Sequence, residues 1–395
     1  MDESVDIHAP EFARDPFAEY ERLREKCPVF SNDRYGGFTL LTRYEDVRAA
    51  AIDWRTYTSA VVGVTAIPVI THRDRPQLPI ELDPPLHSAY RDIVNPLFAA
   101  ARLAELKPRV DALSHRLMEA MIGSRDPEFV AGYADPFSVG ALGVLTGLPT
   151  GDAAKWHEWL RRMFTPKDPA AAKEASRGFG EYIDGLIRHR REAPADDIVS
   201  VLLAARVLER PLTDEEIHSY LTVFFGAGFE TTADAMSGAA FWLAEEPGRL
   251  AVVRDLGERV GTAVEEFLRF VTPIQMFGRN TTRDVELHGS VIPNGRIVAL
   301  GFGAANRDPR VFPDAEICVP GRVPNRHLTF GAGPHLCLGA PLARMEMEIM
   351  LRHLCALTGE IAVRADDQPV WKRRGDRRGL QRLPLSFGAV PQAAA

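Results

Sequence analysis

The sequence predicts a mainly α-helical protein with small β-sheets, an α+β fold. Two patterns support this fold class: helical spacing runs from Pro84 to Phe270, and short strand-like runs follow Val271. Hydrophobic residues make up 46% and charged residues 26% of the 395, values typical of soluble globular proteins. Neither an internal repeat nor a low-complexity linker interrupts the pattern. We therefore expect one domain over residues 1–395.

The first half of the chain alternates one short strand with long helices. A strand is expected at Gly37–Leu41, with a helix resuming near Tyr44. The run Thr213-Asp214-Glu215-Glu216 is typical of a capping box, and the helical pattern after it continues to Glu246. At about 1.5 Å per residue this helix would be roughly 50 Å long, enough to cross the domain.

The second half carries the strands. Val285–Leu287 alternates in polarity, Asn294-Gly295 is typical of a hairpin turn, and Ile297–Leu300 is strand-like. A further helix is expected after Gly339, and the Gly379–Phe387 stretch is predicted to be a strand. The basic run at 372–378 is interpreted as a solvated loop.

Charge and cysteine usage exclude several classes of protein. A net charge of −7 argues against nucleic-acid binding, which needs a basic face. No segment approaches the roughly 18 apolar residues that span a bilayer. The start, Met1–Ser4, lacks the basic and apolar regions of a signal peptide. Four scattered cysteines indicate a reducing compartment rather than a disulfide framework. We expect a cytoplasmic protein that binds neither nucleic acid nor membranes.

The glycine-rich loop around Cys337 is the most informative segment. It reads Phe-Gly-Ala-Gly-Pro-His-Leu-Cys-Leu-Gly over Phe330–Gly339, and its glycines let the backbone approach a flat, bulky group. A lone cysteine is most often a small buried hydrophobe. Cys337, however, directly precedes an expected helix, whose N–H groups and dipole favour a thiolate. Without a second cysteine nearby, this thiolate suits neither zinc nor an iron–sulfur cluster, but it suits one axial bond to haem iron.

The middle of the long helix holds two glycines, Gly226 and Gly228. Each interior glycine costs a helix about 1 kcal/mol relative to alanine. Close packing of another helix would explain them. A widening beside a ligand, flanked by the carboxylate of Glu230 and the hydroxyl of Thr231, would explain them equally well.

With these motifs the chain resembles the cytochrome P450 family over nearly its whole length. The Cys337 loop matches the family's haem-binding signature, and Ala227–Thr232 resembles its oxygen-activation stretch. The Glu-x-x-Arg motif appears at Glu266–Arg269, and 306–314 resembles the segment that follows it. The resemblance implies the triangular P450 fold, haem b held by Cys337, and Arg322 as the third member of the Glu266–Arg269 network.

The resemblance also implies a set of site residues. Glu230 and Thr231 would be catalytic, as an acid–alcohol pair that supplies protons to the oxygen chemistry. The haem propionates would require basic partners. The cofactor-binding residues implied in this way are His87, Arg91, Ala227, Arg279, Phe330, His335, Cys337 and Gly339.

The expected function is that of a haem-thiolate monooxygenase, which inserts one oxygen atom of O2 into a substrate by hydroxylation or epoxidation. The resemblance implies a pocket lid at Ser59–Leu82, apolar at Val61, Val62, Val64, Ile67, Val69 and Ile70. The other residues expected to face the cavity are Phe224, Ala227, Thr272, Ile274, Gln275 and Met276. None of these is cationic, so we expect a medium-sized apolar substrate, such as a terpenoid, an aromatic or a polyketide.

The chain carries no flavin or nicotinamide motif, so electrons are expected from a separate ferredoxin and ferredoxin reductase. We expect a monomer. Two alternatives remain: a haem-thiolate enzyme with other chemistry, such as peroxide-driven hydroxylation, and a non-enzymatic haem sensor. The Glu230–Thr231 pair favours the O2-driven enzyme over both.

Overall fold

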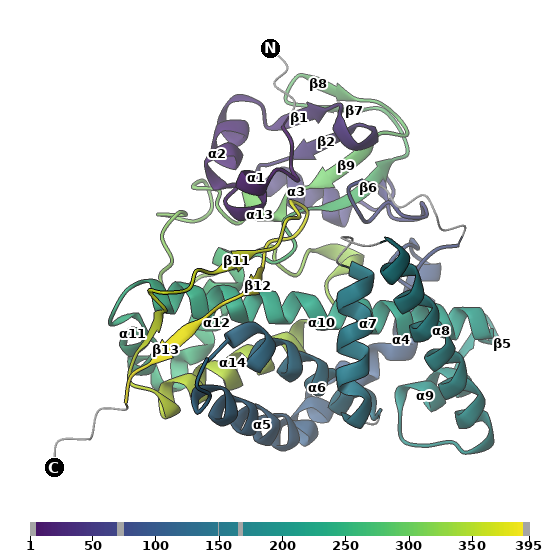
Figure 1. Cartoon of the computed structure of the whole chain (residues 1–395). Helices are drawn as coiled ribbons and strands as arrows, with labels where there is room; N and C mark the ends of the chain where they lie inside the picture. The colour runs from purple at the N-terminus through teal and green to yellow at the C-terminus, as the bar shows by residue number, and fades with distance from the viewer. Residues whose placement is uncertain (1–4, 69–74, 149, 165–168, 390–395) are drawn as a thin grey trace.

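The long helix α10 begins at the predicted capping box and spans Asp214–Glu245. The Glu216 N–H donates to Thr213 Oγ1 at 3.3 Å, and the Thr213 N–H donates to Glu216 Oε2 at 2.8 Å. Both bonds satisfy amide groups that a helix start otherwise leaves unpaired. Figure 1 shows α10 crossing the helical part of the molecule, with α5 and α6 on one side of it.

The computed structural model describes residues 5–68, 75–148, 150–164 and 169–389. Its α-helices are α1 Pro10–Arg14, α2 Phe17–Lys26, α3 Tyr44–Ile52, α4 Leu86–Val94, α5 Ala100–Ile122, α6 Asp135–Thr146, α7 Ala153–Phe164, α8 Pro169–Glu192, α9 Ile198–Ala204, α10, α11 Arg249–Asp255, α12 Val260–Val271, α13 Phe302–Ala305 and α14 Ala340–Leu357. Its strands are β1 Val29–Asn32, β2 Phe38–Leu41, β3 Tyr57–Thr58, β4 Arg206–Val207, β5 Arg210–Pro211, β6 Phe277–Thr281, β7 Val285–Leu287, β8 Ser290–Ile292, β9 Ile297–Leu300, β10 Ile361–Val363, β11 Val370–Trp371, β12 Leu380–Arg382 and β13 Leu385–Phe387. The mainly α fold with small sheets is confirmed.

The strands form one mixed sheet and several two-stranded pairs. The mixed sheet has the order β1-β2-β9-β6-β3, with β2 and β9 parallel and the other pairs antiparallel. It lies beside α1 and α2, apart from the large helical layer (Figure 1). The largest hydrophobic cluster joins α5, α6, α10, α12 and α14, so the long helix is held on several sides by apolar contacts.

Two strand predictions differ from the structure. Asn294-Gly295 does form a turn, but it connects β8 to β9, which belong to different sheets. The hairpin instead joins β7 to β8 and turns at His288 and Gly289, both with positive φ. The predicted Gly379–Phe387 strand is two strands, β12 and β13, which pair with different partners. Pro384 between them lacks the N–H that an uninterrupted ladder would need.

The prediction of a solvated loop for the basic run is wrong. Gly375 and Asp376 are buried, and Lys372, Arg374 and Arg377 are each at least two-thirds shielded from solvent. The run closes the β11–β12 hairpin, which lies between the mixed sheet and the helical layer (Figure 1). Carboxylates on α10 pair with its cations, and that partnership is not visible in the local sequence.

Among the residues that the structure describes, no helix combines the length and the apolar character needed to cross a bilayer.

Candidate functional site

Cys337 lies between a short 3₁₀ turn, Gly333–His335, and the start of α14. Its N–H donates to the Phe330 carbonyl at 2.9 Å, which closes the glycine-rich loop. Although solvent reaches the residue, the protein crowded around it raises the pKa of the thiol. The N–H groups of Gly339 and Ala340, together with the charge of Arg91, oppose that rise. The helix start therefore acts in favour of the thiolate, but burial outweighs it and the net pKa of the thiol is raised.

Two other residues of the loop lie close to the cysteine. A Cβ added at Gly339 would stand 3.9 Å from Cys337 Sγ, so any larger group there would crowd the sulfur. The Phe330 ring lies under the Arg344 guanidinium, with 4.6 Å from Cζ to the ring centroid. Arg344 in turn binds Glu265 through Nε at 2.7 Å. These contacts tie the loop to α12 and α14.

Four basic residues from distant segments meet near this loop. The His87 ring of α4 and the His335 ring lie 4.2 Å apart between centroids. Arg91 NH1 donates to the Pro334 carbonyl at 3.2 Å. The pKa of His335 is lowered to about 2, mainly by burial and next by the charge of Arg279. Burial and the charge of Arg91 lower the pKa of His87 to about 4. The structure therefore brings all four predicted bases together.

This cluster fits the two carboxylates of haem. His87 Nδ1 and His335 Nε2 are buried and have no hydrogen-bond partner in the described part of the chain. Arg279 is 4% exposed, and burial lowers its pKa to about 10. Buried cations and orphaned nitrogens are costly unless an anion or acceptor meets them. The residues present thus suit a doubly anionic group close to Cys337.

Ala227 and Thr231, one turn apart on α10, share one face of that helix. Thr231 Oγ1 donates to the Ala227 carbonyl at 2.9 Å, and Ala227 itself is exposed. Helical geometry continues through this stretch. A Cβ added at Gly228 would meet the Leu142 side chain of α6 at 3.3 Å, so this glycine permits close helix packing. Ser138 of α6 donates to the Phe229 carbonyl at 2.9 Å.

Glu230 points away from Thr231 into an ionic cluster. Its Oε1 lies 2.8 Å from Lys372 Nζ, and its Oε2 lies 2.8 Å from Arg377 NH1. Burial alone would raise the pKa of Glu230, but these two cations hold it well below its usual range. Asp234, one turn further along α10, shares Lys372 at 2.8 Å. The local sequence around Glu230 does not indicate Lys372 and Arg377, because they lie 142 and 147 positions away.

Glu266 and Arg269 form a fully buried ion pair, and Arg322 is the third member of this network, as predicted. Arg269 donates to Glu266 from Nε at 2.8 Å and from NH2 at 2.7 Å. Arg322 Nε lies 3.1 Å from both carboxylate oxygens. Asn325 Nδ2 and the Val319 N–H complete the shell at 3.0 and 2.8 Å. This network fixes the segment that leads into the Cys337 loop.

Several predicted cavity-lining residues lie elsewhere. Thr272 and Gln275 are each 1% exposed and Met276 is 2% exposed, so the prediction that they face a cavity is wrong. Thr272 Oγ1 donates to the Arg269 carbonyl at 2.7 Å, and Gln275 Nε2 donates to the Thr272 carbonyl at 2.6 Å. Thr272 Oγ1 and Gln275 Nε2 thus satisfy carbonyls at the end of α12, whereas Gln275 Oε1 is buried with no hydrogen-bond partner in the described part of the chain. In the predicted lid, Val69 and Ile70 lie outside the described residues.

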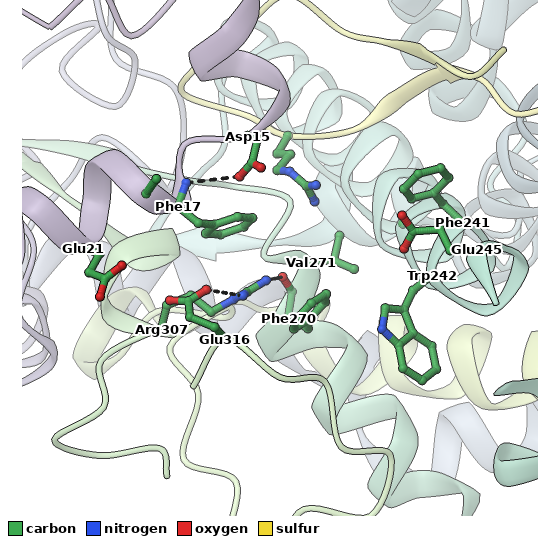
Figure 2. A pocket seen from close by; sticks show the side chains of 13 residues that line it. Asp15, Phe17, Glu21, Phe241, Trp242, Glu245, Phe270, Val271, Arg307 and Glu316 are labelled. Atoms are coloured by element: carbon green, nitrogen blue, oxygen red, sulfur yellow. Dashed lines mark hydrogen bonds and ion pairs between the residues drawn. The ribbon is translucent and has the colours of Figure 1, made fainter. Parts of the chain in front are cut away.

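A separate cavity of about 400 Å³ lies between α2 and the end of α10 (Figure 2). Arg307 lies between Phe17 and Phe270, with 4.0 and 3.8 Å from Cζ to the ring centroids. Its NH1 binds Glu316 at 2.7 Å. None of the residues that line this cavity belongs to the predicted haem set.

Comparison with known proteins agrees with this geometry. The family "Cytochrome P450" matches residues 152–255 and 260–355. The polyketide biosynthesis cytochrome P450 PksS of Bacillus subtilis is 30% identical, over 96% of this chain and 98% of its own length. The solved structure of PksS aligns with a TM-score of 0.88, over 97% of this chain and 100% of that one.

Two further relatives cover nearly the full chain. Nocardicin C N-oxygenase of Nocardia uniformis is 32% identical, over 94% of this chain and 93% of its own length. CYP109E1 of Bacillus megaterium, solved in complex with testosterone, aligns with a TM-score of 0.86 at 27% identity, over 95% of this chain and 99% of that one. With its cysteine loop, buried bases and long helix, the chain belongs to the bacterial cytochrome P450s and is a haem-thiolate monooxygenase that uses haem b.

Proposed function

We propose that this enzyme oxidises a medium-sized apolar natural-product-like molecule with electrons from a separate ferredoxin system. The observation that carries the site assignment is Cys337, just before α14, beside a cluster of four bases. His87 and Arg279 are buried, Arg91 and His335 are half-buried, and both histidines have an orphaned ring nitrogen. Cys337 would hold the haem iron through its sulfur. His87, Arg91, Arg279 and His335 would bind the propionates, and the neutral imidazoles would contribute N–H donors rather than charge.

When bound, the haem supplies the oxygen-activating chemistry, and the protein supplies positioning and protons. The N–H groups of Gly339 and Ala340 would help a thiolate at Cys337, because they oppose the burial that raises the pKa of its thiol. Thr231 Oγ1 donates to the Ala227 carbonyl in the structure. During the reaction this hydroxyl would turn from that carbonyl, or bond to it more weakly, so that it could orient a water molecule and pass a proton to the oxygen site. General acid catalysis of this kind is typically worth about 10²–10⁴-fold in rate.

The substrate class follows from what remains near Thr231. Phe224 of α10 packs against Phe98, with 5.9 Å between ring centroids, and Ile274 is only partly buried. Lys372 and Arg377, which lie against this stretch of α10, are both paired with Glu230. An apolar substrate without an anionic anchor fits this environment. The relative PksS is a polyketide biosynthesis P450, which supports a polyketide as one member of this class.

Electron supply is tested by reconstitution. The purified holoprotein is combined with NADPH, a surrogate ferredoxin and a ferredoxin reductase. Testosterone, the ligand of the solved CYP109E1 relative, is the first probe, and spectral binding titrations identify further probes. We expect oxygenated product only when both redox proteins are present. Turnover with NADPH alone would contradict the separate electron supply. Steady turnover with H2O2 alone would instead favour the peroxide-driven alternative.

A further inference from the structure

Glu81 is a buried carboxylate inside the predicted lid, the loop that precedes α4. The structure describes 59–68, the first half of this loop, and 75–83, its second half. Glu81 is 1% exposed. Its Oε1 accepts from the Gly63 N–H at 3.0 Å and from Thr65 Oγ1 at 3.3 Å, and its Oε2 accepts from the Gln77 N–H at 2.9 Å. One side chain of the second half thus ties the two halves together.

The first half of the loop lies against β6. The Gly278 N–H donates to the Thr65 carbonyl at 3.4 Å, and a Cβ added at Gly278 would clash with the Val64 carbonyl. Val64 itself is fully buried. Gly278 directly precedes Arg279, one of the four bases beside Cys337. The first half therefore runs along the wall of the site that carries Arg279.

The second half lies against α10 and leads into α4. The Leu78 N–H donates to Ser219 Oγ at 2.9 Å, and Ser219 lies about two turns before Ala227 on α10. Further along, the Asp83 carbonyl accepts from the His87 N–H at 2.9 Å, within the first turn of α4. The second half therefore connects the α10 wall of the site to the helix that carries His87.

We propose that Glu81 is a positioning residue for the substrate, because it joins the two halves of the lid between β6 and α10. Glu81 is buried within the loop, so it would act through the loop backbone and not by contact with the substrate. If the halves separate, only the fraction of molecules with a closed lid binds well, and the apparent Kd rises in inverse proportion to that fraction. This inference rests on the proposed apolar substrate and the haem site at Cys337.

Glu81→Gln keeps the shape of the side chain but cannot keep these hydrogen bonds. Each carboxylate oxygen accepts from a backbone N–H, whereas an amide offers one oxygen and one NH2 donor. In either orientation of the amide, the N–H of Gly63 or that of Gln77 therefore faces another donor. A buried donor without an acceptor is costly, so we expect the two halves of the lid to separate in most molecules of this variant.

Glu128→Gln is the matched control. Glu128 Oε1 accepts from the Val130 N–H at 3.0 Å and from the Leu383 N–H at 2.6 Å, and Oε2 accepts from the Ala131 N–H at 2.6 Å. The same substitution thus disturbs the same kind of hydrogen bonds, at the start of the π-helical segment Val130–Ala134. None of these partners belongs to the lid or to the predicted haem set. A purely structural effect would appear in both variants, whereas an effect on the lid would not.

Azole titrations of the holoprotein test the lid without turnover. Imidazole binds haem iron and is too small to need the lid, whereas clotrimazole adds three aromatic rings that would pack beneath it. In Glu81→Gln the Kd of clotrimazole should rise about tenfold, and that of imidazole should change by less than about twofold. Glu128→Gln should keep both values. An unchanged Kd of clotrimazole in Glu81→Gln, or the same rise in Glu128→Gln, would overturn the proposal.

Thr65→Val is a milder variant, for the case in which Glu81→Gln does not retain haem. It removes only the hydroxyl donor to Glu81 and should raise the Kd of clotrimazole about threefold, with that of imidazole unchanged. A wild-type Kd of clotrimazole in this variant would count against the tie.

Hydrogen exchange gives a second readout that needs no ligand. The amides of Gly63 and Gln77 should exchange faster in Glu81→Gln than in the wild type, and Glu128→Gln should leave their exchange unchanged. Equal exchange in the wild type and Glu81→Gln would refute the tie. Neither measurement uses electrons or product. Failure of the reconstituted system to oxidise any substrate would therefore count against the proposed function, and the azole and exchange data would still decide the role of Glu81.

Discussion

Replacing Glu266 by Gln should destabilise the protein strongly. Its two carboxylate oxygens accept from Arg269, Arg322, Asn325 and the Val319 N–H at 2.7–3.1 Å, and Glu266 and Arg269 are 0% exposed. The substitution leaves two guanidinium groups without their anion. Removing one partner of a buried pair costs about 3–5 kcal/mol in the free energy of unfolding.

The neighbouring Glu265 provides the control. Its side chain is 29% exposed and pairs with Arg344 at 2.7 Å and with His327 at 3.1 Å. Burial would raise the pKa of Glu265, but one hydrogen bond from His327 and two from Arg344 lower it to about 2. Solvent still reaches the group, so Glu265→Gln should cost about 1–2 kcal/mol, less than Glu266→Gln. Thermal unfolding of both variants at equal haem loading and scan rate makes the comparison. Equal midpoints for Glu266→Gln and Glu265→Gln would refute the reasoning.

The free energy that Glu266 contributes to folding depends on pH, and the direction follows from its pKa. Burial would raise the pKa of Glu266, but Arg269, the Val319 N–H and Arg322 lower it below the ordinary value. A lowered pKa stabilises the folded state above the unfolded value of about 4.3, and this contribution is lost as the pH falls through the folded value. The deficit of Glu266→Gln should therefore be full at pH 7 and shrink in acid.

Three further substitutions test the oxygen site and its hairpin. Thr231→Ala should leave haem content and substrate binding intact. NADPH consumption should continue while product falls and H2O2 rises, and one assay can measure all three. Wild-type product per NADPH would mean that the hydroxyl does not deliver protons. Glu230→Gln should slow overall NADPH consumption instead, and an unchanged rate would mean that Glu230 does not supply protons. Gly379→Ala should displace Asp234, since the new Cβ would lie 2.0 Å from its carboxylate, and should lower the free energy of unfolding by about 1–3 kcal/mol; a wild-type unfolding midpoint would contradict this.

The sequence predicts those parts of the molecule whose causes are local. The capping box at Thr213 and the helix after Gly339 depend on residues within one turn, and both appear in the structure. The Cys337 loop was identified because glycine spacing and a helix start are contiguous features. The meeting of His87, Arg91, Arg279 and His335 was predicted only through the family resemblance, because these residues are up to 248 positions apart.

What the sequence did not reveal depends on pairing between distant segments. Lys372 and Arg377 resemble a solvated basic run until α10 brings Glu230 and Asp234 against them. Thr272 shows a second, local cause: its hydroxyl donates to the Arg269 carbonyl at the end of α12 and not to a ligand. A polar residue in the sequence can bind a substrate or can form a hydrogen bond with the backbone, and the residue type alone does not distinguish the two roles.

The central claim, a haem held by the Cys337 thiolate, is tested most directly by the absorption spectrum of the reduced protein under CO. The wild type should show the red-shifted band of a thiolate-ligated haem, and Cys337→Ser should lose it. Cys355→Ser, on the same helix α14 but half-buried away from its start, should keep the band. Retention of the band in Cys337→Ser would contradict the assignment of the ligand.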